Sequence, residues 1–180
     1  MQPLKIKTVT LLFLLFLLIL PSAHRAYGQE DRDLYRRANQ AACKGEDDFA
    51  FVYFYRLLNY FPDSEYRQQA LFATGEYYYS IGDYRDAAVA FERSISNFPE
   101  SEAKIFAIAY LLKIAKIKGD QKKAEKLKQG LISLEQVSLL FREFEELKYT
   151  SPFCKDYKIL NFIDKIEIYV GDELFDKISF

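Results

Sequence analysis

The apolar residues between Ser64 and Asn97 follow the spacing of two consecutive helices. In the first half they recur at helical intervals, at Ala70, Leu71, Ala73, Tyr77 and Tyr78. In the second half the same spacing holds for Ala87, Ala88, Phe91 and Ile95. Gly82 and Asp83 separate the halves, because Gly tolerates the left-handed conformation that ends many helices and Asp accepts hydrogen bonds from the amides that begin the next. The pattern predicts a helical hairpin in which Gly75 and Ala87 allow close packing.

This hairpin is one copy of a longer repeat. Gly45, Gly82 and Gly119 are 37 positions apart, and an acidic residue follows each of them. The connection Phe61-Pro62-Asp63-Ser64-Glu65 recurs as Phe98-Pro99-Glu100-Ser101-Glu102. A fixed period in this range is typical of a solenoid, whose units bury their apolar faces against one another. We therefore expect an all-α superhelical solenoid of about three helix pairs over residues 29–131, with units at about 31–67, 68–104 and 105–131.

Residues 132–180 no longer follow the repeat, and we expect them to form a C-terminal helical cap or a degenerate fourth pair. Apolar residues recur at helical spacing in Leu131–Leu147 and again in Tyr157–Val170. Two alternatives stay open. The isoleucine-rich stretch Lys165–Val170 also suits a strand, as does Glu173–Phe180. The whole segment is either a cap or a tail that docks a partner.

The N-terminal segment 1–28 has the pattern of a secretory signal peptide. Lys5 and Lys7 precede an apolar run from Val9 to Leu20, and small residues follow. The run of 12 residues is shorter than the roughly 20 that span a membrane. We expect cleavage near Gly28, with cuts after Ala23 or Ala26 and a retained anchor as alternatives. No Cys directly follows the apolar run, as it would in a bacterial lipoprotein, so we expect a periplasmic chain.

The composition argues against several classes of function. Without residues 1–28, 22 basic residues stand against 26 acidic ones, a net charge of −4 with no nucleic-acid footprint. The single His, His24, lies in the expected signal peptide, which excludes Ser-His-Asp and Cys-His catalysis and His-containing metal sites. The acidic run Glu46-Asp47-Asp48 lies at an expected helix start, where the helix dipole favours it. We expect no catalytic activity, cofactor or metal.

The repeat resembles the tetratricopeptide repeat. The second copy matches its pattern of small, aromatic and Pro positions at Gly75, Tyr78, Ala87, Phe91 and Pro99. The first copy matches at Ala38, Ala50, Phe54, Leu57 and Pro62, and the third lacks the Phe and the Pro. The stretch "FVYFYRLLNYFPDSEYRQQALFATGEYYYSIGDYRDAAVAFERSISNFPES" resembles, more narrowly, the long-repeat branch of BamD-type outer-membrane assembly lipoproteins and CpoB-type periplasmic proteins.

The resemblance implies a groove, formed by the first helix of each pair, that binds a protein or peptide of the cell envelope. Its positions map onto Tyr35, Asn39, Gln69, Phe72, Glu76, Tyr79, Phe106, Lys113 and Lys116. The alternative is that these aromatic residues pack against the C-terminal segment or one another. The implied role is a non-catalytic scaffold in outer-membrane biogenesis. A CpoB-like role in cell division or peptidoglycan coordination, or a place in a secretion apparatus, is the alternative.

Two further features each allow two interpretations. Lysines cluster around Gly119. They form either a solvated face or a contact for an acidic partner or anionic lipid, which would give peripheral membrane association. Cys43 and Cys154 are the only cysteines. They either form a disulfide that ties the tail to the first repeat, as in many exported proteins, or remain unpaired thiols. Their separation along the repeats favours unpaired thiols.

Overall fold

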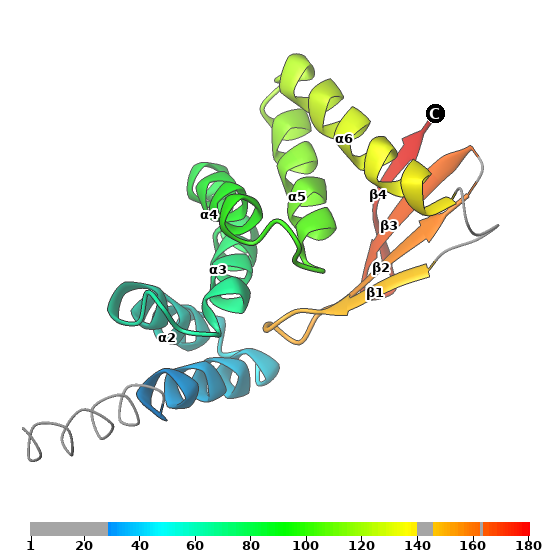
Figure 1. The fold of residues 1–180 in the computed structure, drawn as a ribbon. Helices are drawn as coiled ribbons and strands as arrows, with labels where there is room; N and C mark the ends of the chain where they lie inside the picture. Colours follow the sequence, from blue (N-terminus) through cyan, green and yellow to red (C-terminus); the bar gives the residue numbers. More distant parts are fainter. Residues whose placement is uncertain (1–28, 140–145, 163) are drawn as a thin grey trace, which may run out of the picture.

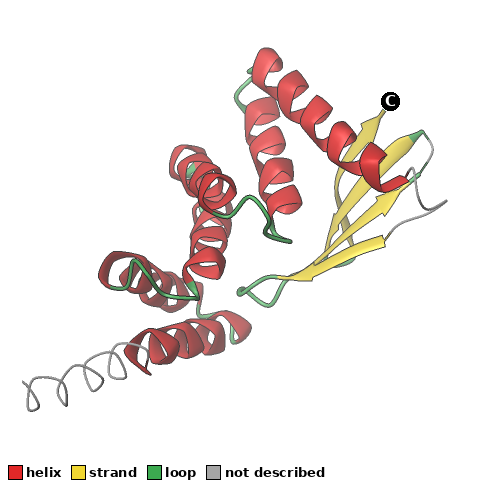
Figure 2. Ribbon diagram, viewed as in Figure 1, coloured by secondary structure: helices red, strands yellow, loops and turns green. Residues whose placement is uncertain are grey.

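The computed structural model describes residues 29–139, 146–162 and 164–180, in which helices are followed by a four-stranded antiparallel sheet (Figures 1 and 2). Helix α1 covers residues 29–43. The other elements are α2 (Asp47–Tyr60), α3 (Arg67–Ser80), α4 (Tyr84–Asn97), α5 (Lys104–Ile117), α6 (Gln121–Leu139), β1 (Glu146–Thr150), β2 (Asp156–Asn161), β3 (Lys165–Val170) and β4 (Glu173–Ser179). The predicted signal peptide lies outside the described residues.

The three glycines of the repeat end three helices with the same geometry. Gly45, Gly82 and Gly119 have φ values of +75°, +81° and +70°, in the left-handed region that favours glycine. The amide of the following acidic residue donates to a carbonyl five residues back in each copy, at 2.9 Å to Ala41, Tyr78 and Ala115. These closures are Schellman motifs, and they satisfy carbonyls that the helix end leaves unpaired. The 37-residue period of the sequence is therefore also a period of the backbone.

The acidic residue after each glycine begins the next helix. Asp83 accepts a hydrogen bond from the amide of Asp86 at 3.1 Å, and Asp120 accepts one from Lys123 at 3.0 Å. Glu46 makes no such side-chain bond. The prediction that Gly82 ends one helix and Asp83 caps the next is confirmed.

Close packing within the second pair depends on Gly75. A Cβ atom at this position would lie 2.7 Å from the ring of Phe91, which is fully buried. Real side chains essentially never approach so closely, so α3 and α4 can adopt this spacing only with Gly at position 75. Ala87, also fully buried, lies on the same helix as Phe91.

We expect Gly75→Ala to lower the free energy of unfolding by about 1–3 kcal/mol, because the added methyl overpacks a rigid aromatic contact. Gly130→Ala in α6 is the matched control. Its Cβ would meet no atom within 4 Å, so it should stabilise the helix by about 0.5–1 kcal/mol. Urea denaturation of both variants measures the difference. Equal effects of the two substitutions would contradict the close packing.

The predicted C-terminal helical cap is wrong, and so is the all-α class in this part of the chain. The strands run in the order β1-β2-β3-β4, and each pairs antiparallel with the next. Burial alternates along β2 and β3, so that Tyr157 and Ile159 face the core with Ile166 and Ile168. This is the two-residue period of a half-buried strand, and β-branched residues favour it. The strand alternatives for Lys165–Val170 and Glu173–Phe180 are the ones that the structure adopts.

The sheet and the helices share one hydrophobic core. Phe72, Phe91, Phe106 and Tyr110 from the helices form a single buried cluster with Tyr157, Ile159, Ile166, Ile168 and Ile178 from the strands. A second cluster near the N-terminus joins α1, α2 and α3 to Phe153 of the β1–β2 loop. Figure 1 shows the tip of this loop beside α3 and close to the end of α1. The C-terminal segment is therefore integral to the fold.

Among the described residues, no helix combines the length and the apolar character that crossing a membrane requires.

Candidate functional site

The predicted groove corresponds to the inner face of the helices, which we define by the residues of α1, α3 and α5 that point toward the C-terminal sheet. The nine predicted groove residues lie on these three helices. The structure places most of them against residues 149–176 of the same chain.

An aromatic layer fills the middle of the inner face. Phe72 and Phe106 are 0% and 1% exposed. Tyr149 stacks on Phe106 with ring centroids 5.7 Å apart, and it meets Phe72 edge-on at 5.4 Å. Tyr157 lies 5.8 Å from Phe72 and 5.1 Å from Phe106. Stacked and edge-to-face pairs of this kind contribute beyond the area that they bury, so this layer holds β1 and β2 against the helices.

The far end of the inner face holds β4. Tyr79 is half-buried beside Tyr110 and Phe175, with ring centroids 4.8 and 6.1 Å away. Lys113 donates from Nζ to the carbonyl of Phe175 at 2.9 Å. Lys116 pairs with Asp176 at 2.7 Å. Both predicted groove lysines are therefore engaged by the chain itself.

At the N-terminal end of the inner face, the predicted groove residue Tyr35 contacts other residues of the helical repeat. Tyr35 of α1 stacks on Tyr66, which precedes α3, with ring centroids 4.3 Å apart and planes 15° from parallel. Its edge also meets Phe54 at 6.2 Å. Tyr35 thus holds α1 against α2 and against the connection that leads into α3. The other two groove residues at this end, Asn39 of α1 and Gln69 of α3, are both half-buried.

A buried carboxylate lies at the centre of the contact. Glu76 of α3 is 1% exposed. Its Oε1 accepts hydrogen bonds from the hydroxyls of Tyr157 at 2.6 Å and Ser151 at 3.0 Å. The hydroxyls of Tyr110 and Tyr157 are 2.7 Å apart, so Tyr110 donates to Tyr157 when Tyr157 donates to Glu76. A polar chain therefore runs from α5 through β2 to α3 inside the aromatic layer.

Burial changes the acidity of this group. Removal from water raises the pKa of Glu76 from 4.5 to about 7, although Lys155 at 4.0 Å and the two hydroxyl donors favour the charged form. Burial and the neighbouring Glu76 also raise the pKa of Tyr157, of Tyr110 and of Tyr149 above the usual value for tyrosine. The tyrosines therefore stay neutral donors over the physiological range, and Glu76 is the group of this network that titrates near neutrality.

Three groove positions carry a buried oxygen that the chain does not satisfy. These are Oδ1 of Asn39, Oε1 of Gln69 and Oε2 of Glu76, none of which has a hydrogen-bond partner among the described residues. Buried polar atoms are normally paired. The inner face is therefore closely packed in its aromatic part, whereas these three oxygens are buried without a partner.

A disulfide joins Cys43 at the end of α1 to Cys154 in the β1–β2 loop, with Cα atoms 5.4 Å apart. The favoured sequence interpretation, two unpaired thiols, assumed that the repeats keep the two residues apart. The antiparallel sheet instead folds back across the inner face, so that its loop returns to the first repeat. Cys154 has φ +55°, which is unusual for a residue other than Gly, and Phe153 packs beside it at 5.8 Å from Phe54. Neither cysteine is free to carry a lipid while the bridge exists.

Several residues of this contact were missed by sequence reasoning, namely Tyr110, Tyr149, Ser151, Lys155 and Tyr157. Tyr110 follows Phe106 by one helical turn, which is a usable signal for the same face. The others lie in or beside strands, and the helical interpretation of Tyr157–Val170 hid the alternation that places Tyr157 and Ile159 on one face. A polar residue between apolar ones, such as Lys158, was the available signal.

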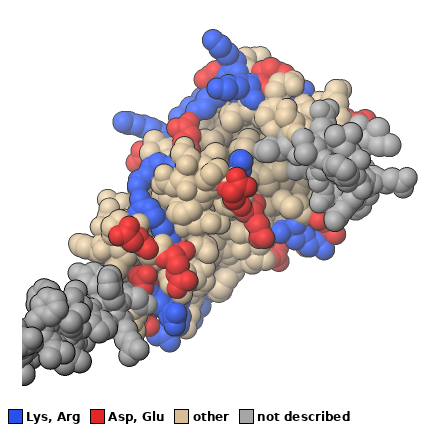
Figure 3. Space-filling view, viewed as in Figure 1, with Lys and Arg blue, Asp and Glu red and all other residues tan. Residues whose placement is uncertain are grey.

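The lysines around Gly119 have mixed environments. Lys113 and Lys116 contact β4, and Lys123 pairs with Glu92 at 2.7 Å. Lys118, Lys122 and Lys126 are exposed. Figure 3 shows basic side chains toward the top of the view, where α5 and α6 meet, with acidic side chains among them there and over the rest of this face. In the described part of the chain, no group of three or more His, Cys, Asp or Glu residues is arranged to hold a metal ion.

These observations define a helical-repeat protein whose inner face is packed against its own C-terminal sheet. A family model described as an outer membrane lipoprotein family, YfiO, matches residues 28–170. The chain therefore belongs to this family, and the match supports the BamD-type resemblance seen in the sequence. The CpoB-type resemblance stays a prediction. A comparison with curated proteins finds no match.

Proposed function

We propose that this protein is a non-catalytic scaffold of the bacterial envelope that takes part in outer-membrane biogenesis through contacts with other proteins. The family match over residues 28–170 carries the proposal. The contacts of the inner face support a scaffold rather than an enzyme, because its polar groups are used to hold the sheet in place. The chain would act on the periplasmic side of the outer membrane after cleavage near Gly28.

The filled inner face affects how a partner binds. A peptide could reach Phe72, Phe106 or Glu76 only if β1 and β2 left the helices, which would break the aromatic layer and the bonds to Glu76. We therefore place the working contacts on surfaces that remain exposed, on the outer sides and ends of the helices. The nine predicted groove residues act in this proposal as the attachment site of the sheet.

The proposal is tested by depleting the protein and measuring the amount of folded β-barrel protein in the outer membrane. We expect folded barrels, detected by their heat-modifiable migration in gels, to decrease before cell shape changes. Complementation with the unaltered chain should restore them. Normal barrel levels together with chained or misshapen cells would contradict this role and favour the division or peptidoglycan alternative. Loss of a secreted substrate alone would favour the secretion apparatus.

A further inference from the structure

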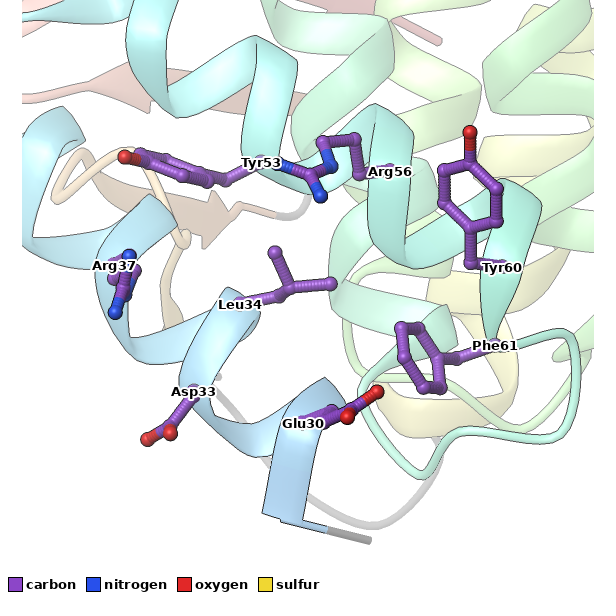
Figure 4. A pocket seen from close by; sticks show the side chains of 8 residues that line it. All are labelled: Glu30, Asp33, Leu34, Arg37, Tyr53, Arg56, Tyr60 and Phe61. Atoms are coloured by element: carbon purple, nitrogen blue, oxygen red, sulfur yellow. The ribbon is translucent and has the colours of Figure 1, made fainter. Parts of the chain in front are cut away.

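The end of the helical array formed by α1 and α2 carries an open groove. Its cavity has a volume of about 590 Å³. In Figure 4, Leu34 points to its middle, with Tyr53 and Arg56 above and Phe61 and Glu30 below and beside it. Asp33, Arg37 and Tyr60 complete the lining. The α1 residues of this lining recur at helical spacing, so they form one face of the helix.

The repeat shows what normally covers this face. Leu34, Arg37 and Tyr53 correspond to Leu71, Thr74 and Ala90 one period later. In the second pair these three are 1%, 5% and 5% exposed, and α2 packs on α3 beside them. In the first pair Leu34 and Tyr53 are half-buried and Arg37 is exposed. In the second pair, α2 covers this face of α3. None of the described helices covers the corresponding face of α1.

The first pair also lacks the polar outer surface expected of a terminal repeat. Phe49, Val52 and Tyr60 of α2 are 64%, 48% and 67% exposed. Phe49 and Tyr60 share a helical stripe with Tyr53 and Arg56, beside the groove. The counterparts of Phe49 and Tyr60 in α4 are polar, Asp86 and Asn97, whereas Val52 corresponds to Val89, which is equally exposed. Terminal repeats normally present a polar outer face to water, so an aromatic one indicates a surface that is covered.

The charges on the open face of α1 are complementary to those on the same face of a second, antiparallel copy. Glu30 lies two helical turns, roughly 10 Å, before Arg37, with Leu34 between them. In two antiparallel copies related by a twofold axis between positions 33 and 34, Glu30 of one copy faces Arg37 of the other, and the two Leu34 side chains meet at the centre. No ion pair joins Glu30, Arg37 or Arg56 to another residue of the described part of the chain. Asp33 is already paired with Arg36 at 3.0 Å.

We propose that the groove between α1 and α2 is the interface of a homodimer, in which a second copy of this chain packs antiparallel on α1 and pairs Glu30 with Arg37 in both directions. Such an interface is isologous, the commonest form in soluble oligomers. Leu34, Tyr53 and the exposed aromatic stripe of α2 supply its apolar centre, and the charges at its rim set the register. This inference rests on α1 and α2 and is independent of the proposed function.

Charge reversal tests the pairing. Glu30→Arg and Arg37→Glu each place like charges opposite one another across the axis, so each should raise the dimer dissociation constant at least about tenfold. The double variant Glu30→Arg/Arg37→Glu restores opposite charges and should return the dissociation constant to within about threefold of the original. Sedimentation equilibrium of the chain recovered from the cell envelope measures all four proteins, and circular dichroism checks that each is folded.

Arg85→Glu is the matched control. Arg85 is exposed on α4, and its reversal changes the net charge as Arg37→Glu does but lies outside the groove. We expect it to leave the dissociation constant unchanged. A chain that stays monomeric throughout the concentration series would overturn the proposal. So would a dimer that withstands both single reversals, or a double variant as weak as the single ones.

Discussion

Replacing both cysteines, as Cys43→Ser and Cys154→Ser, is expected to lower the free energy of unfolding by about 4–5 kcal/mol. The bridge closes a loop across 111 positions of the sequence, and cross-linking a loop of this length restricts the unfolded chain by that amount in the chain-entropy model. Because typical domains are stable by only about 5–15 kcal/mol, the loss is a large part of the total. Urea denaturation of the oxidised protein and of the double variant measures it.

Serine is the suitable replacement at position 154. It keeps a side chain of similar size at a residue whose φ is +55°, so that the cost of the left-handed conformation is the same before and after the substitution. Treating the unaltered protein with a thiol reductant is a second control and should reproduce the loss. Equal stability of the oxidised, reduced and substituted proteins would mean that Cys43 and Cys154 are not paired in the folded chain.

The second large effect is a dependence of stability on pH that originates from Glu76. The unfolded side chain ionises near pH 4.5, whereas burial raises its pKa in the folded protein to about 7. Between these values the folded protein keeps a proton that the unfolded chain has lost. The contribution of protonated Glu76 is therefore complete below about pH 4.5 and is lost as the pH rises to about 7. With roughly 1.4 kcal/mol per pKa unit, the loss is about 3 kcal/mol.

Glu76→Gln isolates this contribution, because the amide has the same shape and cannot ionise. We expect the difference in stability between the two proteins to change by about 3 kcal/mol in favour of the variant between pH 4.5 and 7.5. Denaturant titrations at several pH values measure it, and comparing the two proteins cancels the titration of the other carboxylates. A constant difference across this range would show that Glu76 ionises normally and is not enclosed by Ser151 and Tyr157.

The repeat was predictable because its signals are local. Gly82 ends α3 in the left-handed conformation, and Asp83 caps α4 through a bond that spans three residues. The close packing allowed by Gly75 was also predicted, although the group that approaches it is the ring of Phe91. Each of these features depends on side chains within one helix pair, and the 37-residue period then extended the prediction to the neighbouring pairs.

The sheet was not predictable in the same way. Ile159, Leu160, Ile166 and Ile168 satisfy helical spacing as well as alternation, because short apolar runs are compatible with both periods. What decides between them is the pairing of β2 with β3 and the fit of Tyr157 against Phe72 and Phe106, both of which lie more than 50 positions before it in the chain. Tertiary packing therefore determined the local structure here.

The candidate site was predictable only in part. The tetratricopeptide resemblance selected Phe72, Glu76 and Phe106, and these residues do lie together on the inner face. The resemblance favoured an external peptide on that face, whereas the alternative, that the aromatic residues pack against the C-terminal segment, is the one that the structure adopts. The sequence favoured unpaired thiols at Cys43 and Cys154, whereas the structure joins them in a disulfide. The distance between the two residues depends on the path of the sheet, which the repeat pattern does not reveal.

The central claim is that the chain's own sheet occupies the inner face. A photo-crosslinking residue in place of Tyr79 tests it in intact cells, because Tyr79 lies at the border of this contact with its ring 6.1 Å from Phe175. The account predicts an internal crosslink to β4, found by mass spectrometry in a product of the monomer's mass. Capture of another protein at Tyr79, with no internal product, would contradict it and would show that the inner face is open to a partner.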